Sequence, residues 1–140
     1  MEQKDKELLF KDLSQRLPYK VKCNVYKRIG TLVGLNDYGA EIDYGNGEDT
    51  TCEIQHCYLY LRPMTSMTKK ELYEVQNILG KGVEIQDDFI SIVDSSINSF
   101  TYLELQAVFN WLNAHYFDYC GLIKKDLALE APKDMYVINQ

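Results

Sequence analysis

The chain has 140 residues and a formal net charge of −6, with 46% hydrophobic and 26% charged residues. This balance is typical of a folded domain and excludes a disordered chain, and the acidic charge disfavours non-specific nucleic-acid binding. No apolar stretch approaches the roughly 20 residues that span a bilayer, and the first residues lack the apolar run of a signal peptide, so we expect a soluble cytoplasmic protein without a membrane partner.

The first 63 residues predict a helix followed by short strands. Leu9, Leu13 and Leu17 recur at four-residue spacing among charged positions, which predicts a helix over 3–16. Period-two alternation then predicts strands at 21–25, 31–35 and 40–44, with a turn at 36–39 and a hairpin at 45–47.

The alternation changes phase between residues 52 and 57. Cys52 and Ile54 are apolar at even positions, whereas Cys57, Leu59 and Leu61 are apolar at odd ones. One straight strand cannot bury both sets, so we expect a turn or bulge at 53–56 before a last strand at 57–61. Five short strands with a kinked entry to the last one predict a small SH3-like β-barrel.

The second half predicts an α+β unit. Two capping boxes, Thr68 with Glu71 and Thr101 with Glu104, start helices over 69–79 and 102–116. A short hairpin is expected within 83–93, and the apolar tail over 117–131 is expected to dock. The later helix is apolar over a wide arc, which predicts packing on two sides. We therefore expect an α+β protein with two parts: 1–63 (helix plus five-strand barrel) and 64–140 (two main helices and a hairpin).

Two segments carry a resemblance to other proteins. They are residues 60–68, which read YLRPMTSMT, and residues 111–123, which read WLNAHYFDYCGLI and continue into LALEAP at 127–132. Together they resemble a group of uncharacterised small proteins encoded by gut anaerobic bacteria and their phages. The resemblance implies a bacterial or phage cytoplasm and a mobile-element context, and it implies no chemistry.

Cysteine and histidine cluster at one place in the sequence. Cys52, His56 and Cys57, with Cys23 as a fourth ligand, have the residue types of a zinc site. The spacing does not match a zinc knuckle, and Cys23 and Cys57 occupy apolar strand positions. We therefore favour buried structural thiols over a metal site or a thiol nucleophile, and we expect no metal.

Two further groups have residue types found in active sites. At the end of the long helix the group comprises His115, Asp118 and Cys120. Around the predicted hairpin the acidic group comprises Glu84, Asp87, Asp88 and Asp94. The first group could place an oriented base beside a thiol, but a histidine that complements the helix dipole at the C-terminal end explains it more simply. The second group could bind a cation, but a solvated turn explains it more simply.

A basic stretch at residues 16–28 breaks the acidic composition. No acid lies between Asp12 and Asp37, and small barrels bind nucleic acids through lysine, arginine and interleaved aromatic residues. The candidate nucleic-acid face comprises Lys20, Lys22, Tyr26, Lys27 and Arg28. A charge-protected edge strand is the alternative explanation of this stretch.

Tyrosine is frequent, with 11 residues, and Tyr58 and Tyr60 share the face of the last strand opposite Leu59 and Leu61. Exposed tyrosines favour a protein interface, although helices packed on those rings would explain them equally well. No phosphate loop, dinucleotide fingerprint or nucleophile elbow is present. We therefore expect a non-enzymatic interaction or accessory protein, without a cofactor, that contacts a protein partner or itself. A nucleic-acid-associated accessory factor is the alternative, and an enzyme is third.

Overall fold

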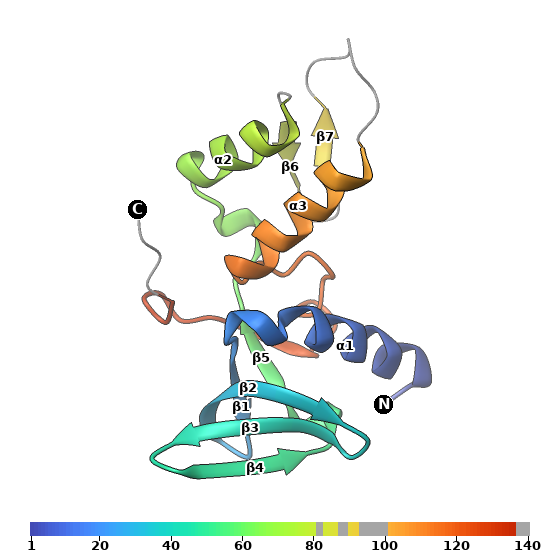
Figure 1. Cartoon of the computed structure of the whole chain (residues 1–140), viewed down its shortest axis with the longest axis vertical. Helices are drawn as coiled ribbons and strands as arrows, with labels where there is room; N and C mark the ends of the chain where they lie inside the picture. The colour runs from blue at the N-terminus through green and yellow to red at the C-terminus, as the bar shows by residue number, and fades with distance from the viewer. Residues whose placement is uncertain (81–82, 87–89, 93–100, 137–140) are drawn as a thin grey trace. The chain divides into compact units, whose positions relative to one another are not determined.

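The computed structural model describes residues 1–80, 83–86, 90–92 and 101–136, and it is α+β (Figure 1). The chain forms two compact units. Unit 1 contains Met1–Leu61 together with the chain from Leu122 onward, and unit 2 contains Arg62–Gly121. This division differs from the boundary expected at residues 63–64, because the C-terminal segment belongs to the first unit.

Unit 1 is built on a six-stranded sheet in the order β4-β3-β2-β1-β5-β8. The elements in chain order are α1 (Gln3–Arg16), η1 (Leu17–Tyr19), β1 (Lys22–Val25), β2 (Arg28–Asn36), β3 (Gly39–Gly45), β4 (Glu48–Cys52), η2 (Ile54–His56), β5 (Tyr58–Leu61) and β8 (Ala128–Glu130). Neighbouring strands are antiparallel except β5 and β8, which are parallel.

The predicted alternation is confirmed in β1 and in β3, where Ala40 and Ile42 are buried. In β2 the predicted phase is wrong, because Leu32 is buried whereas Val33, expected on the apolar face, is exposed. Val21, Cys23 and Val25 are buried, and Cys23 lies opposite Gly30 on one side and Leu59 on the other. The expected phase change is also present, because the 3₁₀ turn η2 over 54–56 rotates the chain before β5. Two turns of α1 add Leu9 and Leu13 to the same core. Burial of these side chains is the main stabilising contribution to the unit.

The predicted closed SH3-like barrel is not confirmed. The strand pairings among the described residues leave the sheet open, with β4 at one edge and β8 at the other. β8 comes from the tail that was expected to dock, and it pairs with β5 from Leu59↔Ala128 to Leu61↔Glu130. The outer edge of β5 is therefore covered by the C-terminal segment of its own chain.

Tyr136 links β1 to β5 where their direct pairing ends. Its hydroxyl donates to the carbonyl oxygen of Tyr60 at 2.7 Å and accepts from the backbone N–H of Lys22 at 2.9 Å. The last direct strand pair is Cys23↔Leu59. In a longer antiparallel ladder the Lys22 N–H and the Tyr60 carbonyl would take part in direct strand-to-strand hydrogen bonds. The Tyr136 hydroxyl bonds to both groups instead.

Unit 2 consists of η3 (Met64–Ser66), α2 (Lys69–Leu79), β6 (Val83–Ile85), β7 (Ile90–Ile92) and α3 (Tyr102–Ala114). Both predicted capping boxes are formed, at Thr68 with Glu71 and at Thr101 with Glu104. The strands β6 and β7 form the expected hairpin. The core is apolar and contains Met64, Val75, Leu79, Val83, Val108, Leu112 and Phe117.

The expectation that the last helix packs on two sides is wrong. Val108 and Leu112 of α3 are buried, whereas Tyr102, Leu103 and Phe109 are exposed. Helix α3 therefore contributes one face to the core of unit 2.

Arg62 joins the two ends of unit 2. Its backbone N–H donates to Tyr116 at 2.7 Å, and its carbonyl accepts from the N–H of Asp118 at 2.9 Å. Its guanidinium lies 4.1 Å from the centre of the Phe117 ring and forms two hydrogen bonds to the carboxylate of Glu71, at 2.7 and 2.8 Å. This bidentate pair ties the first turn of α2 to the start of the unit.

The hydrogen bonds around Glu71 lower the pKa of its carboxyl group. Burial alone would raise it, but hydrogen bonds from Arg62 and from the backbone N–H of Thr68 outweigh burial and hold the pKa below its ordinary value. Because the pKa of Glu71 is lower in the folded than in the unfolded protein, its carboxylate stabilises the fold at pH values above the unfolded-state pKa of about 4.3. That stabilisation is lost as the pH falls through the folded-state pKa.

We predict that Glu71→Gln destabilises unit 2 by about 2–4 kcal/mol at pH 7, because Arg62 loses its buried ionic partner. Denaturant unfolding followed by fluorescence of Trp111, the chain's single tryptophan, measures the effect within this unit. The difference from the unsubstituted protein should shrink as the pH falls below about 4. Exposed Glu84→Gln is the control, with an expected change within about 0.5 kcal/mol. An equal Glu71→Gln deficit at pH 3 and pH 7 would contradict the ionic assignment.

Candidate functional site

The cysteine cluster is a set of buried thiols. Cys23 lies in β1, Cys52 ends β4 and Cys57 directly precedes β5, and all three are buried in the core of unit 1. Hydrogen bonds to Cys23 and Cys52, together with burial, raise the pKa of Cys57 far above its ordinary value, whereas the hydrogen bond from Cys57 lowers that of Cys52. His56 is exposed, with its ring 5.7 Å from that of Tyr26. Within the described residues, no group of three His, Cys, Asp or Glu side chains is arranged to hold a metal ion.

We predict that the three core thiols resist alkylation in the folded protein. Iodoacetamide at neutral pH should modify half-buried Cys120 first, and Cys23, Cys52 and Cys57 only when denaturant is added. Peptide mapping by mass spectrometry identifies each modified residue. Rapid modification of Cys52 or Cys57 without denaturant would show that the cluster is reactive rather than structural.

At the end of α3 the contacts of His115 involve Trp111 and Glu74. The His115 ring stacks on Trp111 with 3.9 Å between ring centres, and its Nδ1 lies 2.9 Å from the Trp111 carbonyl oxygen. Its Nε2 lies 4.0 Å from a carboxylate oxygen of Glu74. Trp111 therefore holds this imidazole by stacking and through its backbone carbonyl, and Glu74 faces the other ring nitrogen. Of the acidic hairpin residues, Glu84 is exposed on β6, whereas Asp87, Asp88 and Asp94 lie outside the described residues.

The basic stretch is divided by the fold. Arg16 is fully buried and forms an ion pair with Asp12 at 2.8 Å. Lys20 precedes β1, whereas Tyr26 and Lys27 form the turn at its other end. Arg28 forms an ion pair with Glu48 at 2.6 Å and lies over the ring of Tyr44. The ammonium of Lys22 donates to the Thr31 hydroxyl at 2.9 Å.

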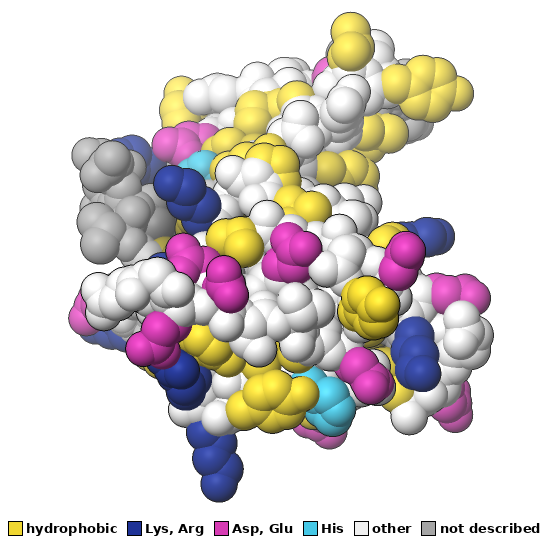
Figure 2. Space-filling model, turned by 60° about the horizontal axis from the view of Figure 1, so that its bottom comes forward, with side chains coloured by type: hydrophobic (Ala, Val, Ile, Leu, Met, Phe, Trp, Pro, Cys, Tyr) yellow, Lys and Arg dark blue, Asp and Glu magenta, His cyan; other side chains and the backbone are white. Residues whose placement is uncertain are grey.

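Acidic side chains accompany these cations on the sheet. Asp43 lies opposite Thr31 in the register, and Thr31 lies opposite Lys22. Figure 2 shows basic and acidic side chains interspersed over the drawn face, without one continuous basic patch. This mixture provides a poor path for a phosphate backbone, which requires clustered positive charge.

Tyr58 and Tyr60 lie on the outer face of β5, as the alternation predicted. The Tyr60 hydroxyl accepts a hydrogen bond from the Asn24 side chain at 3.1 Å, and its carbonyl accepts the hydroxyl of Tyr136. Tyr60 is half-buried and Tyr58 is just over one third exposed. The two rings are therefore partly engaged by their own unit.

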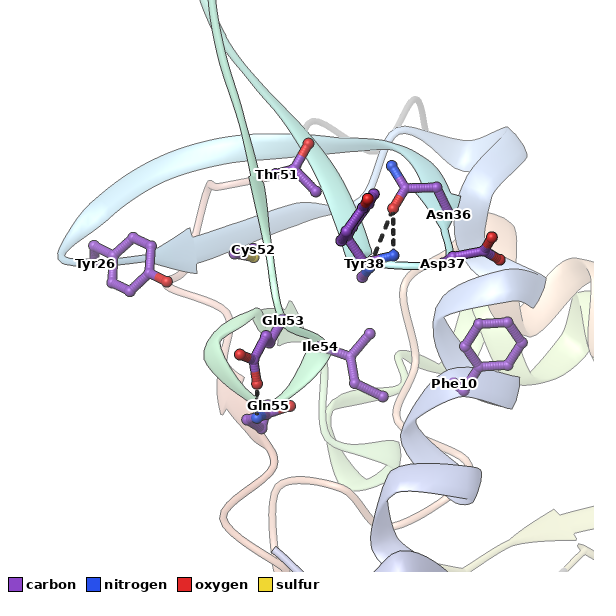
Figure 3. A pocket seen from close by; sticks show the side chains of 11 residues that line it. Phe10, Tyr26, Asn36, Asp37, Tyr38, Thr51, Cys52, Glu53, Ile54 and Gln55 are labelled. Atoms are coloured by element: carbon purple, nitrogen blue, oxygen red, sulfur yellow. Dashed lines mark hydrogen bonds between the residues drawn. The ribbon is translucent and has the colours of Figure 1, made fainter.

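A groove of about 610 Å³ lies at one end of unit 1 (Figure 3). Phe10 from α1 and Tyr26 from the β1–β2 turn stand on opposite sides of the view, and residues 36–39 and 51–55 form the walls between them. Three aromatic residues of this surface are exposed: Phe10 to 47%, Tyr26 to 65% and Tyr38 to 83%. We call this surface the rim groove.

Backbone constraints position both walls of the rim groove. The Asn36 side-chain oxygen accepts from the N–H groups of Tyr38 and Gly39, at 2.8 and 3.2 Å, which fixes the β2–β3 turn. Gly39 has a φ of 143°, and a Cβ there would lie 2.0 Å from the carbonyl oxygen of Cys52. Only glycine permits this approach, which fixes the turn against the segment over 51–55.

The charge of the rim groove is negative. Its charged lining side chains among the described residues are Asp37 and Glu53, and no lysine, arginine or histidine from that part of the chain lines it. Glu53 accepts a hydrogen bond from the side chain of Gln55. Sequence reasoning missed this site, because its residues come from four separate segments and the turn at 36–39 was assigned only a structural role. Exposed Tyr38 beside the turn-forming Asn36 was the available signal.

We predict that Gly39→Ala destabilises unit 1 by more than about 2 kcal/mol, because the new methyl group collides with a backbone carbonyl and the φ is unfavourable. Gly45→Ala is the matched control: its φ is also positive, at 89°, but nothing lies within 4 Å of the added carbon. Its cost should stay near the 1–2 kcal/mol of backbone strain alone. Urea denaturation followed by circular dichroism measures both variants, and equal costs would refute the close-approach constraint.

Comparison with known proteins does not assign this site. No protein-family model, curated protein or solved structure matches the chain. Among the described residues, no helix has the length and apolar character needed to cross a membrane. Function is therefore argued from the geometry of the rim groove.

Proposed function

We propose that this protein is a non-enzymatic interaction module that binds a protein partner through the rim groove. The observation that carries the proposal is the concentration of three exposed aromatic rings, Phe10, Tyr26 and Tyr38, around one hollow. Aromatic side chains that lose water on binding contribute most of the affinity of protein interfaces. Tyrosine also has few rotatable bonds, so little conformational entropy is lost.

The strained β1–β2 turn supports the proposal. Tyr26 and Lys27 both adopt left-handed backbone conformations, with φ of 51° and 67°. Such two-residue hairpin turns favour Asn-Gly, and each non-glycine residue costs roughly 1–2 kcal/mol. Because Tyr26 in this conformation lowers the stability of the turn, its ring is better explained by a role at the groove than by a role in stability.

The two other readings find less support. Catalysis by a nucleophile needs a side chain that a substrate can reach, whereas the three core thiols are buried and the Nδ1 of His115 lies 2.9 Å from the Trp111 carbonyl oxygen. Nucleic-acid binding needs clustered positive charge, which ion pairs and neighbouring acids dilute here.

We predict that the immobilised protein selects peptides from a random dodecapeptide display library, and that Tyr26→Ala with Tyr38→Ala lowers binding of the selected peptides at least tenfold. Loss of two exposed aromatic contacts accounts for this effect. Tyr73→Ala is the control, because Tyr73 is 63% exposed on α2 and lies outside the groove. Affinities are measured by fluorescence anisotropy.

A second variant separates binding from stability. Tyr26→Asn with Lys27→Gly installs the preferred turn sequence, so it should stabilise unit 1 by about 1–2 kcal/mol while it weakens peptide binding. Peptide binding unaffected by both groove variants would overturn the proposal. Salt-sensitive binding of a random 20-nucleotide single strand, lost on charge reversal of Lys20, Lys22, Lys27 and Arg28, would support the nucleic-acid reading instead.

A further inference from the structure

The two edges of the unit 1 sheet differ in their capacity to accept another strand. β8 is three residues long, and Pro132 follows it closely, so it offers a short and interrupted edge. β4 spans five residues, Glu48–Cys52, contains no proline, and pairs only with β3 among the described strands. Its outer backbone N–H and C=O groups are therefore available to an extended peptide.

The free edge leads into the rim groove. Residues 51 and 52 belong to β4 and line the groove, and the groove wall continues through residues 53–55. A strand of five residues spans about 17 Å, so a peptide of similar length would run along β4 and present its end to the aromatic rings.

The charges along this edge are acidic and in part mutually repulsive. Asp43 and Asp49 lie directly opposite each other across β3 and β4, an arrangement that destabilises a sheet. Glu53 lies two residues beyond Thr51. Residues 49, 51 and 53 therefore have the two-residue spacing of side chains on one face of an extended segment. Glu48 already forms an ion pair with Arg28. The carboxylates of Asp49 and Glu53 therefore complement a cationic partner.

We propose that the partner segment is an extended, lysine- or arginine-bearing peptide that adds as a strand to the free edge of β4. This inference rests on the proposed function and names its ligand class. Basic side chains at even spacing would lie on one face of the added strand, beside Asp49 and Glu53. The alkyl and guanidinium parts of these side chains can also stack on the rings of Tyr26 and Tyr38.

The test uses the peptides selected from the random dodecapeptide library on the unsubstituted protein. We expect lysine and arginine to be enriched at even spacing, and affinity to fall at least tenfold between 0.05 and 0.5 M sodium chloride, because charged contacts are screened. Asp49→Lys with Glu53→Lys should lower affinity at least tenfold. Glu130→Lys, a charge reversal at the exposed opposite edge on β8, should leave affinity within twofold.

Hydrogen exchange tests whether the peptide pairs with the backbone of β4. Amide hydrogen exchange of residues 48–52 should slow at least tenfold when a selected peptide binds, and N-methylation of alternate peptide amides should abolish that protection. Asp49→Lys removes the repulsion with Asp43, and a thermal melt confirms that this variant is folded.

Two of the three contrary outcomes separate this inference from the proposed function. Selected peptides that depend on Tyr26 and Tyr38 but are uncharged and indifferent to the Asp49 and Glu53 reversals would overturn the inference and leave the groove intact as a binding site. Basic peptides that give no added protection at residues 48–52 would overturn strand addition. A library that yields no peptide on the unsubstituted protein would overturn both.

Discussion

The contact on which the rim groove depends is the approach of Gly39 to the carbonyl of Cys52. The space there admits only a hydrogen on the Gly39 α-carbon, so the β2–β3 turn and the end of β4 have one allowed separation. Asn36 holds the same turn with two hydrogen bonds to the backbone. Because backbone contacts position the walls, the side chains of Tyr38 and Asp37 need not pack inward, and they remain available at the surface.

The elements predicted correctly from the sequence are those that depend on interactions between residues close together in the chain. The burial of Val21, Cys23 and Val25 followed from period-two alternation, and the 3₁₀ turn over 54–56 followed from the change of phase before Cys57. The two capping boxes also formed where Thr68 and Thr101 predicted them. In each case the interacting residues lie within a few positions of one another, so the pattern itself contains the information.

Features that depend on distant residues were not predictable in the same way. The three-residue strand β8 has no periodicity of its own, so its parallel pairing with β5 and the open sheet could not be inferred. The β1–β2 turn lacks glycine and asparagine, so no two-residue turn was predicted at Tyr26 and Lys27. Without that turn the basic stretch looked continuous, and the groove, which four segments form, was not predicted.

The hydrogen bonds between Arg62 and the segment at Tyr116 and Asp118 have a consequence for the order of folding. Unit 2 is a stretch of about 60 residues inserted between β5 and the chain that supplies β8. Once unit 2 is folded, its two ends are adjacent, and the loop that must close for β8 to reach β5 shrinks by roughly three doublings. That saves about 2 kcal/mol of closure entropy. Folding of the inserted unit thus lowers the entropic cost of completing the sheet. Mutations that loosen the unit should slow this step, although none of its described strands belongs to that sheet.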